Sequence, residues 1–114
     1  MQNNSSNQSL FVVILSYLVK AEKIDAFRPE HLEFLSDCYA KNLFIASGMQ
    51  IPRNGGIIIA KCESKEALQQ ILANDPFAIN NLATYQIIEF IPTKWSDEFE
   101  SILFQSNDKK LAKQ

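Results

Sequence analysis

The stretch Leu10–Val19 reads LFVVILSYLV and is the most hydrophobic part of this 114-residue chain. It is much shorter than the roughly 20 apolar residues that a membrane-spanning helix requires. Residues 1–9, which precede it, contain no Lys or Arg, and no small-residue cleavage site follows it, so it does not fit a secretory signal either. Because the stretch is short and rich in β-branched and aromatic residues, we predict that it forms a buried strand.

The composition is that of a folded globular protein, since 46% of the residues are hydrophobic and 21% are charged. At this length a single domain is expected. The net charge of −2 argues against a nucleic-acid binder, which usually carries a basic surplus. Cys38, Cys62 and the single His31 are too few for a disulfide scaffold or a zinc module. We therefore expect a cytoplasmic protein with reduced thiols, no membrane segment, no metal and no cofactor, preceded by a disordered leader over residues 1–9.

The order of the remaining elements follows from apolar periodicity and from turn residues. A polar link over residues 20–26 leads to a helix that begins near Pro29, because Pro is favoured at the first helical position. This helix ends near Asn42, a residue type that often adopts the left-handed conformation there. Gly55 and Gly56 belong to a predicted turn and are candidates for positive φ. The predicted strands cover residues 10–19, 43–49, 57–62 and 84–91, and the predicted helices cover 28–42, 65–73 and 96–105.

The resulting order, β-α-β-β-α-β with a terminal helix, is that of the ferredoxin-like fold. We predict an α+β domain over residues 10–94, with two helices on one face of a four-stranded antiparallel sheet. Residues 95–114 are predicted to form an added C-terminal helix and tail. The apolar residues on one face of that helix are Trp95, Phe99, Ile102 and Leu103.

The first strand is apolar on both faces, whereas a sheet with one solvated face alternates apolar and polar residues. Its two sets of alternating apolar residues are Phe11, Val13 and Leu15, and Val12, Ile14 and Leu18. The face without helices therefore needs a cover. We infer a two-fold homodimer in which the sheets of two copies lie face to face.

His31 is the first candidate for chemistry, because it lies at the edge of the apolar face near the start of the predicted helix. A helix start disfavours an added positive charge, so a neutral imidazole could accept a proton from a substrate. Arg28, at the same helix end, could hold an anionic group. The alternative is that His31 is a half-buried residue with a local hydrogen bond and no catalytic role.

Asp75 is the second candidate, because its carboxylate could orient the imidazole of His31 and fix its tautomer. The alternative is purely structural, since Asp followed by Pro76 is a common start of a helix. Cys38 and Cys62 lie inside apolar elements, and we expect both to be small core residues rather than nucleophiles.

At these residues the sequence resembles the YciI-like family of small bacterial proteins over about residues 10–94. The motifs that carry the resemblance are Arg28-x-x-His31, Ser47-Gly48, the Gly-led third strand, Ser64-x-Glu66-Ala67, Asp75-Pro76-Phe77 followed by Leu82, and Glu89-Phe90-Ile91-Pro92. The resemblance implies a ferredoxin-like fold assembled as a dimeric α+β barrel, with His31 and Asp75 as the active-site pair. It also implies a substrate pocket that includes Arg28, Ser47, Gly48, Pro76 and Phe77. The leader and the helix after Trp95 extend beyond the usual short domain of that family.

Two functions remain open from the sequence. The first is a cofactor-free lyase, isomerase or dehydrochlorinase that moves protons on a small metabolite, with His31 as base or acid and Asp75 as its partner. The second is a non-catalytic domain that binds a small ligand or serves assembly. A direct His31–Asp75 hydrogen bond in an open cleft favours the first function, and a solvent-exposed His31 far from Asp75 favours the second.

Overall fold

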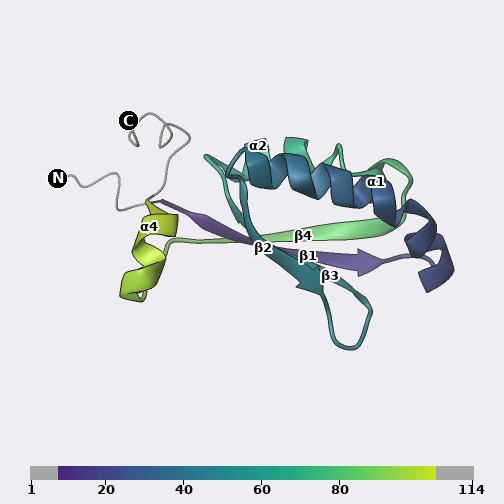
Figure 1. Ribbon diagram of the computed structural model, residues 1–114, viewed down its shortest axis with the longest axis horizontal. Coiled ribbons are helices and arrows are strands. Elements are labelled where there is room, and N and C mark those ends of the chain that lie inside the picture. The colour runs from purple at the N-terminus through teal and green to yellow at the C-terminus, as the bar shows by residue number, and fades with distance from the viewer. Residues whose placement is uncertain (1–7, 105–114) are drawn as a thin grey trace.

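The computed structural model describes residues 8–104 and has the predicted α+β architecture (Figure 1). One antiparallel sheet has the strand order β2-β3-β1-β4, and helices α1 and α2 cover one of its faces. The strands are β1 (Leu10–Tyr17), β2 (Phe44–Met49), β3 (Gly55–Lys61) and β4 (Ala83–Phe90). The helices are α1 (Ala21–Ala40), α2 (Lys65–Leu72), α3 (Pro76–Ile79), the 3₁₀ turn η2 (Asp97–Phe99) and α4 (Glu100–Leu103). The fold class predicted from the sequence is confirmed.

Strand β1 lies in the middle of the sheet, as its apolar sequence predicts. It pairs with β3 on one side and with β4 on the other, so that Val13 lies opposite both Ile58 and Ile87. Phe11, Val13 and Leu15 are buried beneath the helices. Since side chains alternate between the faces of a strand, Val12 and Ile14 point to the opposite face. The core therefore lies between the sheet and the helices α1 and α2.

The start of helix α1 differs from the prediction. The helix begins at Ala21, so the predicted polar link over residues 20–26 is helical and Pro29 lies inside the helix. Ile24 anchors this first part, because its side chain is completely buried in the core. Pro29 lies on the exposed side of the helix and removes one intrahelical hydrogen bond. The burial of Ile24 in the core offsets this loss. His31 therefore lies in the body of the helix, and the expected effects of a helix start on its charge and on anion binding do not apply.

The hairpin between β2 and β3 also differs from the prediction, because no glycine in residues 8–104 has positive φ. Gly55 is needed for a different reason: a Cβ on it would lie 1.7 Å from the backbone oxygen of Leu15 on the neighbouring strand. Within residues 8–104 the residues with positive φ are Asn42 and Asn81. Asn42 lies at the end of α1, as predicted. Ser64 caps α2 as expected, since its hydroxyl accepts a hydrogen bond from the backbone N–H of Ala67 at 3.0 Å.

The C-terminal segment is helical, but over a shorter range than predicted. Helix α4 lies at the end of the sheet where β1 begins (Figure 1). Leu103 is buried, and the ammonium group of Lys61 donates a hydrogen bond to the carbonyl oxygen of Ile102 at 2.8 Å. Most of the predicted leader and the tail beyond residue 104 lie outside the described residues.

The sheet face opposite α1 and α2 is apolar, as the sequence predicts. Val12, Ile14 and Ile59 are half-buried there, while Ile88 and Phe90 are 44% and 43% exposed. Monomeric proteins rarely leave a large continuous apolar patch in water. Separately, residues 8–104 contain no helix that is long and apolar enough to span a membrane.

Candidate active site

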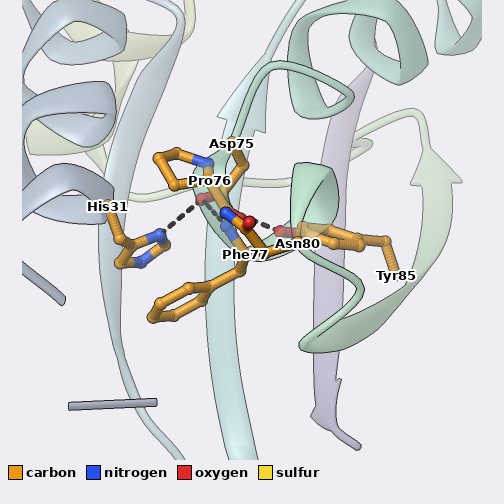
Figure 2. Close-up of polar contacts among 6 residues, drawn as sticks. All are labelled: His31, Asp75, Pro76, Phe77, Asn80 and Tyr85. Carbon is orange, nitrogen blue, oxygen red and sulfur yellow. Dashed lines mark hydrogen bonds and ion pairs between the residues drawn. The ribbon is translucent and has the colours of Figure 1, made fainter. Parts of the chain in front are cut away.

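The site is built around Asp75, whose side chain is completely buried beside the first turn of α3. Three hydrogen bonds converge on this carboxylate (Figure 2). Its Oδ1 accepts from the backbone N–H of Phe77 at 3.0 Å and lies 2.8 Å from Nδ1 of His31. Its Oδ2 accepts from the hydroxyl of Tyr85 at 2.6 Å. Asp75 is therefore both a helix cap and a partner of His31, so the two interpretations of this residue do not exclude each other.

His31 comes from α1 and reaches Asp75 across 44 positions of the sequence. Its ring stacks on the ring of Phe77, with centroids 4.0 Å apart and an interplanar angle of 5°. Because an ionised carboxylate only accepts hydrogen bonds, Nδ1 must carry the proton that is shared with Asp75. In the neutral ring Nε2 then has the free lone pair. This nitrogen lies on the side of the ring away from Asp75 (Figure 2). Within residues 8–104 the only side-chain hydrogen bond of His31 is the one from Nδ1.

Tyr85 is a member of this group that the sequence analysis missed. Burial raises the pKa of its hydroxyl, and the nearby charge of Asp75 and the hydrogen bond to it raise the pKa further. The hydroxyl therefore stays protonated and acts as a donor. The alternation along β4 gave a signal that could have identified it, because Ala83, Tyr85 and Ile87 all point toward the helices. A tyrosine on a buried face usually has a hydrogen-bond partner for its hydroxyl.

A cavity of about 190 Å³ lies between α1 and the strands β2 and β3, and His31 forms part of its wall. The predicted residues Arg28, Ser47, Gly48 and Phe77 also line it. Pro76, the first residue of α3, does not line the cavity. The sequence analysis did not identify the remaining wall, which is mainly apolar and consists of Leu15, Tyr17, Leu32, Leu35, Met49, Gly56, Ile57 and Ile58.

Among residues 8–104, Arg28 is the one Lys or Arg in the wall of this cavity. Its guanidinium is 3.5 Å from the carboxylate of Asp25, which is a long contact between exposed groups. Asp25 forms a shorter ion pair with Arg53, and this hydrogen bond is the main reason why the pKa of Asp25 is lowered. Asp25 is thus held mainly by Arg53. Ser47 adds a hydroxyl group to the wall, which is 2.7 Å from the hydroxyl of Tyr39.

The two cysteines lie in the core and do not line the cavity. Burial raises the pKa of the Cys38 thiol to about 11, so it is a poor nucleophile at neutral pH. Within residues 8–104 no group of three or more His, Cys, Asp or Glu residues is arranged to hold a metal ion. The imidazole of His31, which lies 2.8 Å from the buried carboxylate of Asp75, is the titratable group of this cavity with a buried partner.

Comparison with known proteins agrees with this architecture. The family model of the YCII-related domain matches residues 10–91. The 5-chloro-2-hydroxyhydroquinone dehydrochlorinase of Burkholderia phenoliruptrix AC1100, in complex with 2,5-dihydroxybenzoquinone, superimposes with a TM-score of 0.59 at 18% identity. That comparison covers 76% of this chain and 93% of the dehydrochlorinase.

A conserved protein from Methanosarcina mazei Go1 is also similar, with a TM-score of 0.51 at 17% identity over 75% of this chain and 94% of the other. No curated protein matches the sequence. At these identities the solved structures establish a shared fold.

Proposed function

The chain belongs to the YCII-related family, and from this premise we propose that it is a cofactor-independent acid–base enzyme that moves a proton on a small molecule. The observation that carries the proposal is the 2.8 Å contact between Nδ1 of His31 and the buried carboxylate of Asp75. This contact leaves Nε2 with a free lone pair, on a side chain that lines a cavity. A side chain so placed is a general base, and such proton transfer typically contributes roughly 10²–10⁴-fold in rate.

Each residue has a separate role in the proposed reaction. Nε2 of His31 removes a proton from a C–H or O–H group of the substrate, and Asp75 stabilises the imidazolium that forms. The electron pair left on the substrate moves to an adjacent carbonyl or expels a leaving group. The imidazolium then returns its proton either to another atom of the substrate, as an isomerase does, or to the departing group, as a lyase does.

The volume and lining of the cavity indicate which small molecules fit it. A dry cavity of about 150 Å³ is large enough for benzene, so a cavity of about 190 Å³ accepts one six-membered ring with few substituents. Arg28 favours an anionic substituent, and the apolar wall favours the ring itself. The dehydrochlorinase with the same fold, in its complex with a single-ring quinone, is consistent with a ligand of this size. We therefore propose a monocyclic anion with an acidic C–H or O–H group as the substrate class.

A second copy of the chain is the proposed cover of the apolar sheet face. Ile88 and Phe90 are more than two-fifths exposed there, beside the half-buried Val12 and Ile14. A two-fold axis over this face would bury the same residues from both copies. Light scattering should give twice the mass of the chain at micromolar concentration, and a stable monomer would contradict the proposal.

Proton abstraction can be tested before the full reaction is known. The protein is incubated in D₂O with a panel of monocyclic carboxylates and phenols that carry acidic C–H groups, and NMR follows the loss of each C–H signal. His31→Ala should slow the exchange by roughly 10²-fold or more. Gln70→Ala, at an exposed position of α2, is the control and should exchange at the wild-type rate. Compounds that bind without any exchange, detected as a rise in melting temperature, would instead indicate a binding protein.

A further inference from the structure

We propose that Tyr85 is a positioning residue that holds the carboxylate of Asp75 in the one orientation that keeps the proton of His31 on Nδ1. The effect of Tyr85 on catalysis rests on the proposed function above. Its effect on the tautomer of His31 does not, because a tautomer can be measured without a substrate.

The distribution of donors around Asp75 supports this role. Oδ1 is shared between two donors, the backbone N–H of Phe77 at 3.0 Å and Nδ1 of His31 at 2.8 Å. Oδ2 accepts from Tyr85 at 2.6 Å, and no other donor to it lies within residues 8–104. An acceptor that is buried without a donor is costly. Without the hydroxyl of Tyr85, the carboxylate therefore gains by rotating, and rotation moves Oδ1 out of line with at least one of its two donors.

The surroundings of Tyr85 add a second reason for this role. Its ring lies in the wall of another hollow, of about 550 Å³, formed by α2, α3 and β4. Lys65, Gln69 and Gln86 also line that hollow, so it is partly polar. Asp75 is nevertheless completely buried. Tyr85 thus stands between this hollow and the carboxylate, and it supplies the hydrogen bond that water would otherwise provide.

The test uses the fact that His31 is the single histidine of the chain. In ¹⁵N-labelled protein the chemical shifts of the two ring nitrogens report which one carries the proton in the neutral ring. The wild type should be almost entirely protonated on Nδ1. Tyr85→Phe removes the hydroxyl group and keeps the ring, and it should raise the population of the Nε2–H tautomer roughly tenfold. If a substrate is found, kcat should fall with little change in KM, because Tyr85 does not line the cavity.

A matched control separates positioning from general loosening of the core. Ile87→Val changes the next inward residue of β4, and it should destabilise the protein without changing the ring-nitrogen shifts of His31. Replacement of Tyr85 by p-aminophenylalanine restores an N–H donor at the para position and should restore the wild-type tautomer. This second replacement also decides the question if Tyr85→Phe does not fold. An unchanged tautomer in Tyr85→Phe, or an equal change in Ile87→Val, would overturn the proposal.

Discussion

Replacement of Asp75 should be among the most destabilising single substitutions in this protein. Asp75→Ala leaves three donors without an acceptor in a buried site: Nδ1 of His31, the N–H of Phe77 and the hydroxyl of Tyr85. Hydrogen bonds to a charged group contribute about 1.5–3 kcal/mol each. The three are not additive, and removal of a buried charge returns part of the loss. We therefore expect the free energy of unfolding to fall by about 4 kcal/mol.

Asp75→Asn tests the same reasoning in the opposite direction. The amide oxygen can accept from Phe77 and His31, while the amide nitrogen can donate to the oxygen of Tyr85. All three contacts are kept, but the negative charge is lost and the Tyr85 O–H and one amide N–H are left without an acceptor, so the free energy of unfolding should fall by about 2 kcal/mol, less than in Asp75→Ala. Both variants are compared with the wild type by urea unfolding at pH 7, where an unchanged m-value shows that the transition is comparable. If Asp75→Ala loses less than about 1 kcal/mol, the three hydrogen bonds do not hold the site together.

Three further predictions follow from individual contacts. Gly55→Ala should lower the free energy of unfolding by about 2–3 kcal/mol or more, because the added Cβ would overlap the backbone of Leu15. Gly48→Ala is the control, since its added Cβ meets nothing within 4 Å and should leave the unfolding midpoint unchanged. Burial raises the pKa of the Cys38 thiol from 9.0 to about 11, so as the pH rises this thiol ionises first in the unfolded chain. The free energy of unfolding should therefore be unaffected by Cys38 below pH 9 and fall between pH 9 and 11. The fall should be smaller in Cys38→Ala, and parallel curves of unfolding free energy against pH for the two proteins would contradict this cause. Deletion of residues 96–114 removes the buried Leu103 and should lower stability by about 2 kcal/mol, so an unchanged melting temperature would show that the segment is dispensable.

Much of the fold could be predicted from the sequence because it depends on local patterns. The apolar run of β1 required a central, buried strand, and Ser64 and Asn42 marked a helix start and a helix end correctly. The start of α1 could not be predicted in this way. Pro29 is a strong local signal for a first helical position, whereas the burial of Ile24 depends on packing against the sheet, which is a tertiary effect.

The candidate site was partly predictable for a related reason. His31 is the one histidine of the chain and Asp75 precedes a proline, so both residues can be identified as candidates from the sequence alone. Tyr85 has no comparable feature in the sequence, since tyrosine is common in strands and its role depends on the position of its hydroxyl group in the folded protein. That position follows from the register of β4 against β1, which places Tyr85 opposite Leu15. A register of this kind is set by the whole sheet rather than by neighbouring residues.

Three consecutive residues explain why a site can form at α3 at all. Pro76 occupies the first helical position, where its missing N–H costs nothing, and this leaves the N–H of Phe77 to bind Oδ1 of Asp75. The ring of Phe77 then stacks on His31, so residues 75–77 supply both the hydrogen-bond acceptor and the flat surface that hold the imidazole. The orientation of the imidazole therefore depends on this helix start, and a substitution that weakens the cap should also weaken the proposed general base.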